Sequence, residues 1–350
     1  MQSQTEHPRR YEMHPTAAAV DLEALGDSLR RHVRGEVRLD AGARAAWSTD
    51  ASNFRQIPLA VVLPVDAEDL EATLAACREV GAPVTHRGGA TSLAGQTTNA
   101  AVIVDCSKHL RGILQLDPDR RIARVQPGVV LDDLRRAAEE HGLTFGPDPA
   151  THDRCTLGGM IGNNSCGTHS IMAGRTVDNV ESLEVACYDG TRLHLGPLDE
   201  DARQRAVSGG GRWGEIVAGL GDLARLHEGE IRARFPDIPR RVSGYNLDEL
   251  LAERGFHLAR AVVGTEGTCV SVLEATLRLI PSPPVRLLVV LGYPDAFVAA
   301  DTVPDLLAAG PLAIEGIDAR LLENMASKGL RSRERSMLPE GQAFLFVEVG

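Results

Sequence analysis

The chain has 350 residues, of which 43% are hydrophobic and 24% charged, and its formal net charge is −11. This length can bury a large core and form two or more domains. The acidic balance, the scarcity of aromatic residues and the lack of a dense basic patch exclude a nucleic-acid partner.

The cysteines and the N-terminal residues indicate the cellular compartment. The six cysteines include no pair with CxxC spacing, so the sequence predicts no local zinc or iron–sulfur site. The first 20 residues lack an apolar signal core, and no apolar run reaches the roughly 18 residues of a membrane span. We expect a cytoplasmic protein with free thiols and no transmembrane segment.

The first hundred residues alternate between helix and strand patterns. Residues 1–20 predict a tail, and Asp21 can cap a helix over 21–34 whose leucines recur at helical spacing. Further elements are predicted in chain order: a strand at 59–63, a helix at 66–80, and strands at 83–85 and 102–105. This β-α-β rhythm indicates a small mixed or parallel sheet.

Hairpin signals dominate from residue 110 onward. Asp117-Pro118-Asp119 and Asp189-Gly190 are turn sequences, each between two apolar runs, and they predict two antiparallel hairpins. Helices are predicted over 131–141 and 213–235, and a β-rich segment over 268–280. We place a domain boundary at the proline-rich residues 281–284.

The last 65 residues predict a β-α-β-α-β run. Its strands are expected at 286–292, 312–317 and 343–349, and its helices at 295–309 and 319–327. We expect the final strand to be left unpaired at an edge, and therefore that the sequence is a fragment of a longer one.

The first motif that could carry chemistry is a glycine-rich loop directly after a strand. Small residues let successive backbone N–H groups converge on an anion, and hydroxyl and amide side chains add donors. A plain glycine-rich turn without a ligand remains the alternative. The candidate residues are Arg87, Gly88, Gly89, Ala90, Thr91, Ser92 and Gln96.

The second motif, residues 156–168, is short of charge and too glycine-rich for a stable independent helix. Such a stretch makes sense where backbone must approach a large ligand closely. The alternative is a flexible surface loop, although Met160 and Ile161 favour burial.

Two shorter glycine segments are less specific. Residues 262–268 form a tight turn before a long strand. Residues 209–214 fit GxGxxG, but a dinucleotide fingerprint needs an apolar strand before it, and residues 201–208 are charged and helical in character. We therefore reject a Rossmann site there.

No hydrolytic constellation is present: the sequence has neither a GxSxG elbow at Ser92 nor HExxH spacing. His86, His152 and His169 lie in or near the glycine loops, and we interpret them as positioning or surface residues. No metal site and no catalytic residue is assigned.

In this order and spacing, the three glycine elements resemble the flavin domain of the vanillyl-alcohol-oxidase, or PCMH-type, superfamily. The chain is most similar there to FAD-linked D-2-hydroxy-acid dehydrogenases of the glycolate oxidase, D-lactate and D-2-hydroxyglutarate type. Residues 47–50 and the Gly244-Tyr245-Asn246-Leu247 segment match the family as well. The resemblance covers residues 45–349.

The resemblance implies an α+β fold. After an N-terminal tail and helix (1–44), a PCMH-type FAD-binding domain is expected over 45–282, with subdomains 45–110 and 111–282. Residues 285–350 would begin an antiparallel-sheet substrate cap that is truncated.

The resemblance also implies site residues. Residues 87–92 would wrap the pyrophosphate of FAD, and Val263 and Gly264 would approach the adenine or flavin edge. The flavin and ribityl side would be lined by Pro147, Asp148, Gly158, Gly159, Asn163, Ser165 and Gly167. Some relatives link FAD through a histidine in the first loop; here that neighbourhood reads Gly89-Ala90, so we expect non-covalent FAD.

The implied reaction is oxidation of a D-2-hydroxy acid by hydride transfer to flavin N5. The electron acceptor would be a quinone, an electron-transfer protein or an iron–sulfur domain. An iron–sulfur cluster or divalent metal, and the catalytic residues, are expected only beyond residue 350, so we expect this piece to bind FAD without turning over a hydroxy acid by itself. The specific acid and the oligomeric state are not predicted.

Two other functions are compatible with the same fold. One is a flavin-binding or electron-transfer subunit that acts with a partner chain. The other is an NADPH-dependent enolpyruvyl-UDP-sugar reductase, against which the Gly244-Tyr245-Asn246-Leu247 segment and the cap argue.

Overall fold

The computed structural model describes residues 20–350, so the predicted N-terminal tail lies outside the described residues except for its last position. The chain divides into two compact units. Unit 1 comprises residues 20–87, 92–105 and 188–190, and unit 2 comprises residues 88–91, 106–187 and 191–350.

Unit 1 is built on a mixed four-stranded sheet in the order β1-β2-β4-β3. Strands β2, β4 and β3 are parallel, and β1 is antiparallel to β2. Its elements are α1 (Leu22–His32), β1 (Glu36–Arg38), α2 (Ala41–Ala46), β2 (Ala60–Leu63), α3 (Ala67–Glu79), β3 (Val84–Arg87) and β4 (Val102–Asp105). The predicted mixed sheet is confirmed, whereas the short β1 and α2 were not predicted.

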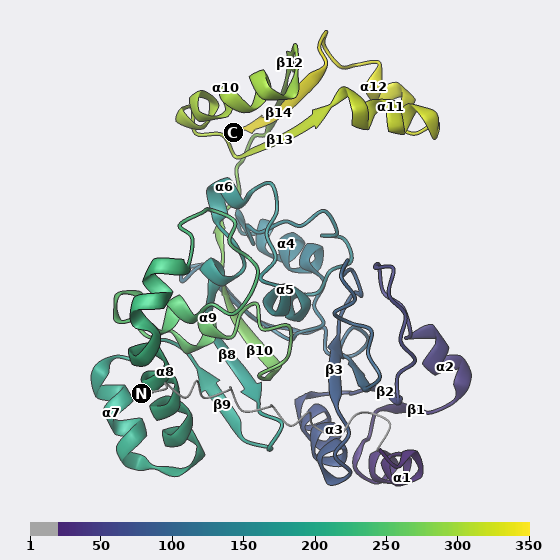
Figure 1. The fold of residues 1–350 in the computed structure, drawn as a ribbon, viewed down its shortest axis with the longest axis vertical. Helices are drawn as coiled ribbons and strands as arrows, with labels where there is room; N and C mark the ends of the chain where they lie inside the picture. The colour runs from purple at the N-terminus through teal and green to yellow at the C-terminus, as the bar shows by residue number, and fades with distance from the viewer. Residues whose placement is uncertain (1–19) are drawn as a thin grey trace, which may run out of the picture. The chain divides into compact units, whose positions relative to one another are not determined.

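Capping explains where the helices of unit 1 begin. The Asp21 carboxylate accepts the N–H groups of Glu23 and Ala24, as the sequence predicted for α1. Helices α1 and α3 lie side by side (Figure 1), and their apolar residues share one core with the buried strands β2 and β4.

Unit 2 contains an antiparallel five-stranded sheet in the order β5-β6-β10-β8-β9. Its strands are β5 (Ile113–Asp117), β6 (Ile122–Val125), β8 (Val180–Ala186), β9 (Arg192–Leu195) and β10 (Ser271–Arg278). The two predicted hairpins are β5-β6 and β8-β9. A two-stranded pair joins β7 (Leu143–Thr144) and β11 (Ile280–Pro281).

Helices contribute to the core of this sheet. They are α4 (Leu131–Glu139), α5 (Leu157–Asn163), α6 (Ser170–Ala173), α7 (Glu200–Gly209), α8 (Gly211–Arg234) and α9 (Leu258–Ala261), with 3-10 turns η2 (Val177–Asn179), η3 (Leu247–Leu250) and η4 (Ala252–Arg254). Buried residues of α4, α5 and α8 share one cluster with β8 and β10. The GxGxxG-like residues 209–214 join α7 to α8, so a helix and not a strand precedes them, as predicted.

The last part of unit 2, from residue 285, is called the cap below. Its sheet has the order β12-β14-β13 and is antiparallel, with helix α10 along it (Figure 1). The elements are β12 (Leu287–Tyr293), α10 (Ala296–Ala308), β13 (Ala313–Asp318), α11 (Ala319–Ser327), α12 (Ser332–Arg335) and β14 (Ala343–Val349).

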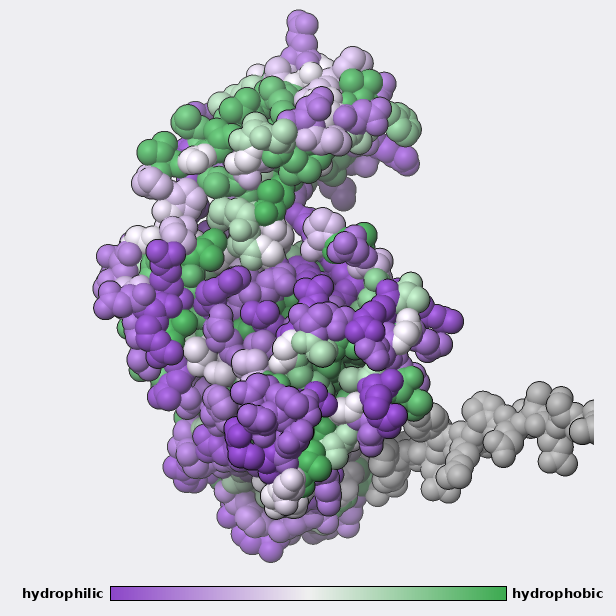
Figure 2. Space-filling view, turned by 90° about the vertical axis from the view of Figure 1, so that its left-hand side faces the viewer, coloured by the Kyte–Doolittle hydropathy of each residue, from purple (hydrophilic) through white to green (hydrophobic). Residues whose placement is uncertain are grey.

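The expectation that the final strand is unpaired is wrong. Strand β14 lies in the middle of the cap sheet and pairs with both β12 and β13, because the chain returns between the two earlier strands. The open edges belong to β12 and β13 instead. Hydrophobic side chains gather on the surface of the cap (Figure 2). Leu287 and Leu288 of β12 are both exposed.

Within residues 20–350, no helix is both long and apolar enough to cross a membrane.

Candidate functional site

The second glycine motif begins with a helix that the sequence did not predict, α5. The Thr156 hydroxyl accepts the N–H of Gly159 at its start, and Asn164 ends it in a left-handed conformation with φ 54°. Met160 and Ile161 are 1% and 2% exposed. Burial of these two side chains offsets the low helix propensity of the glycines, which is why propensity alone did not predict the helix.

The first glycine loop lies against the start of α5. A Cβ added to Gly88 would overlap the Thr156 hydroxyl, and one added to Gly89 would overlap the Arg154 carbonyl oxygen. Gly88 is therefore required because the Thr156 side chain lies against it, and Gly89 because another stretch of backbone does.

The backbone N–H groups of this loop are available to a ligand. In the part of the chain that the structure describes, no protein acceptor takes the N–H of Gly89, Ala90 or Thr91. Ala90 has a φ of 54°, in the left-handed region. Where a left-handed residue adjoins a right-handed one, successive backbone N–H groups point toward one concavity that can bind an anion.

The third glycine element joins the far end of α5. Gly264 N–H donates to the Ile161 carbonyl at 2.8 Å, and Glu266 N–H donates to the Gly162 carbonyl at 2.9 Å. The buried Asn246 side chain donates to the Val263 carbonyl at 2.7 Å, which adds the Gly244–Leu247 segment to the same cluster. Elements more than 150 residues apart in sequence thus meet around one short helix.

One side of α5 is exposed to solvent. Gly159 and Asn163 are exposed on α5, and a Cβ at Gly159 would meet only the Thr156 hydroxyl, at 3.3 Å. Gly159 therefore contrasts with Gly88, because protein atoms do not fill the space beside it.

Strained backbone gathers in the three glycine elements. Of the six non-glycine residues with positive φ in the described chain, Ala90, Asn164 and Glu266 belong to them, one to each. Such conformations cost of order 1–3 kcal/mol and persist where the surrounding structure fixes them, often at ligand sites.

The remaining predicted residues of unit 2 lie beyond the C-terminus of α5. Asn163 donates to the Ser165 hydroxyl at 2.9 Å. The Asp148 carboxylate accepts the N–H of His169 at 2.9 Å, and a Cβ at Gly167 would overlap the Asp148 backbone. Pro147 is buried and Gly158 packs on Pro127. Asp148 and Gly167 thus hold each other in place through direct contact.

Three predicted residues, Arg87, Ser92 and Gln96, belong to unit 1. Arg87 donates to the Trp47 carbonyl at 3.2 Å, and burial lowers the pKa of Arg87. The Gln96 side chain accepts the Ala94 N–H at 3.1 Å, so its oxygen is used within its own loop. Burial also lowers the pKa of His86 to about 4, which keeps its imidazole neutral at pH 7.

A family model described as an FAD binding domain matches residues 58–196, a range that includes the first two glycine elements. Residues 58–196 are therefore called the FAD-binding domain below. The chain has the same fold as part of a solved structure of alkyldihydroxyacetonephosphate synthase, with a TM-score of 0.65 at 15% identity over 98% of this chain and 57% of that one.

The resemblance to FAD-linked D-2-hydroxy-acid dehydrogenases is confirmed. A D-2-hydroxyglutarate dehydrogenase of Pseudomonas putida is 36% identical over 310 residues, which are 86% of this chain and 30% of that protein. Glycolate oxidase subunit GlcD of Bacillus subtilis is 30% identical over 303 residues, 84% of this chain and 54% of that subunit. The chain thus spans between about a third and a half of the length of these relatives.

The residues of the FAD-binding domain fit the cofactor. Free N–H groups at Gly89, Ala90 and Thr91 match the acceptor oxygens of a pyrophosphate, and the open side of Gly159 leaves room for a ligand in van der Waals contact.

Proposed function

We propose that the protein is an FAD-dependent oxidoreductase that oxidises a D-2-hydroxy acid, such as D-2-hydroxyglutarate, D-lactate or glycolate. The names of its relatives support this substrate class. When bound, FAD supplies the hydride acceptor, flavin N5, for the hydrogen on the carbinol carbon.

The first and second glycine elements hold FAD in this proposal. Residues Gly88 to Thr91 bind the pyrophosphate through backbone N–H groups, and Gly158 and Gly159 let the cofactor lie against α5. The observation that carries the proposal is the set of N–H groups without a protein acceptor beside the exposed Gly159. Val263 and Gly264 contribute by fixing the C-terminal half of α5 from behind.

Most of the remaining predicted residues fix the backbone near α5. Asn163 and Ser165 hold each other at the end of α5, and Asp148 and Gly167 fix the loop that follows. Arg87, Ser92 and Gln96 stay predictions as ligands of FAD. No residue of this chain is proposed as the base that takes the hydroxyl proton.

Anaerobic mixing of the FAD-loaded protein, at its full encoded length, with D- and L-forms of 2-hydroxyglutarate and lactate and with glycolate tests this function. The proposal expects one D-acid or glycolate to bleach the oxidised flavin absorbance while the L-acids do not. Bleaching by NADPH, with none by any hydroxy acid, would contradict it and favour the reductase alternative.

A second candidate is a flavin-binding subunit that passes electrons to a partner chain. The relative from Bacillus subtilis is named as a subunit of glycolate oxidase, which favours this candidate. In that case the substrate-reduced protein should be reoxidised slowly by a soluble quinone. Fast reoxidation by the quinone alone would show that a partner chain is not needed.

A further inference from the structure

A buried histidine bridges two carboxylates that come from distant parts of unit 2. His169 follows the second glycine motif, and its Nδ1 contacts the Asp148 carboxylate. Its Nε2 lies 3.2 Å from Oε1 of Glu348, on strand β14 of the cap. The side chains of His169 and Asp148 are only 9% and 10% exposed.

Other polar and charged groups contact the two carboxylates of this bridge. Asp148 also accepts from the Thr168 hydroxyl at 3.3 Å, and the Arg286 Nε lies 3.9 Å from the Glu348 carboxylate. Within the described residues, neither His169 Nε2 nor Glu348 Oε1 makes a well-aligned hydrogen bond. When His169 is protonated, attraction between its imidazolium and the Glu348 carboxylate pairs these two buried atoms.

Protonation of His169 follows from the same contacts. The hydrogen bond with Asp148 raises the pKa of His169 most, Glu348 raises it further, and burial opposes both. The stabilisation from a raised histidine pKa is complete below its unfolded value of about 6.5 and is lost as pH rises through the folded value. The bridge is thus strong in mild acid and weak in base.

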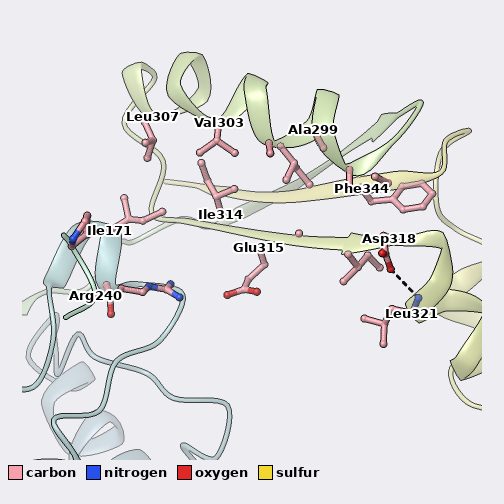
Figure 3. A pocket seen from close by; sticks show the side chains of 18 of the residues that line it. Ile171, Arg240, Ala299, Val303, Leu307, Ile314, Glu315, Asp318, Leu321 and Phe344 are labelled. Atoms are coloured by element: carbon pink, nitrogen blue, oxygen red, sulfur yellow. Dashed lines mark hydrogen bonds between the residues drawn. The ribbon is translucent and has the colours of Figure 1, made fainter. Parts of the chain in front are cut away.

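The bridge lies next to a cleft of about 1020 Å³. One wall includes Ile171 of α6 and Arg240. His169 directly precedes α6. The cap sheet and α10 form the other wall, where Ile314 points toward α10 and Glu315 points to the opposite side of β13 (Figure 3). Arg240 donates to the Gly167 carbonyl at 2.7 Å, so the first wall is continuous with the second glycine motif.

We propose that His169 is a positioning residue that fixes strand β14 of the cap to the second glycine motif and thereby sets the width of this cleft. The inference concerns this chain's own residues and does not depend on the identity of the substrate. It assigns His169 a role in placing the cap and not in proton transfer, since both ring nitrogens face carboxylates.

Histidine NMR titration tests the bridge directly. The chain has 11 histidines, and loss of one signal in His169→Asn assigns the resonance. His169 should titrate above the ordinary value, and Glu348→Gln should move its pKa downward. Glu315→Gln, which removes the same charge from the neighbouring strand, should leave it unchanged. An ordinary pKa in the unmodified protein, or equal effects of the two glutamine variants, would overturn the proposal.

Trypsin cleavage after the exposed Arg286 tests the consequence for the cap. The ratio of the cleavage rate in His169→Asn to that in the unmodified protein cancels the protease's own pH dependence. This ratio should be several-fold in mild acid and should fall toward one as the pH rises through the titration of His169, where its imidazole becomes neutral. A merely structural role predicts a ratio that does not change with pH, and that result would also overturn the proposal.

Discussion

Gly88 and Gly159 show why a glycine motif cannot be interpreted from composition alone. A side chain at Gly88 would overlap Thr156, whereas Gly159 faces space that protein atoms do not occupy. Gly88 leaves room for the Thr156 side chain, whereas Gly159 leaves a surface open. The sequence predicts both as ligand residues, because the spacing of glycines along the chain does not reveal which atoms lie opposite each one.

Gly159→Val should weaken FAD binding. The two added methyl groups occupy the space where the cofactor is proposed to lie, and overpacking of this kind costs about 1–3 kcal/mol, or roughly 10- to 150-fold in affinity. Fluorescence titration of the apoprotein with FAD measures the effect. Gly229→Val is the matched control, since Gly229 is also an exposed helical glycine with nothing within 4 Å of its added Cβ. Unchanged affinity in Gly159→Val would remove α5 from the cofactor site.

Gly88→Ala should destabilise the protein even without FAD. Its Cβ overlaps the Thr156 hydroxyl, and relief of the overlap requires one loop to shift, at a cost of about 1–3 kcal/mol. Urea unfolding of the apoprotein measures this loss. Gly159→Ala should cost less in the same assay, because its single contact, 3.3 Å from the Thr156 hydroxyl, is tight but is not an overlap. Equal stability of the two alanine variants would contradict the close approach at Gly88.

At the scale of elements, the sequence predicts regular structure well wherever a pattern is local. The capped helix α1, the parallel strands of unit 1 and both hairpins follow from periodicity and turn residues. Helix α5 does not, because its stability comes from Met160 and Ile161 buried in a core assembled from distant segments. Contacts such as Gly264 with Ile161 have no local signal at all.

Asn246 and Tyr245 both tie the Gly244–Leu247 segment to the third glycine element, and of the two only Asn246 is buried. Asn246→Ala removes the buried donor to the Val263 carbonyl and should cost about 1–3 kcal/mol of unfolding free energy. The loosened turn at Gly264 should also weaken FAD binding. Ser243→Ala, at an exposed position three residues earlier, should change neither quantity. Asn246→Ala with full stability and full affinity would show that this hydrogen bond does not support the site.

At the scale of the molecule, the sequence identifies the FAD-binding domain but not the order of strands in the cap. The order of the strands depends on where in the sheet the chain places its last strand, β14. The pattern of hydrophobic residues along β14 would be the same for a central and an edge strand, so it does not reveal that place. The boundary placed at residue 282 and the roles of Arg87, Ser92 and Gln96 stay predictions. So does non-covalent attachment of FAD, which rests on Ala90 in the first loop.

The account depends above all on FAD held by backbone groups without a covalent bond. The direct measurement is the absorbance spectrum of the protein, incubated with FAD and desalted, before and after acid precipitation. We expect a flavin spectrum in the native protein and all of the yellow colour in the supernatant after acid. Flavin that remains with the pellet would contradict the non-covalent site, and a protein that stays colourless after incubation would contradict the account as a whole.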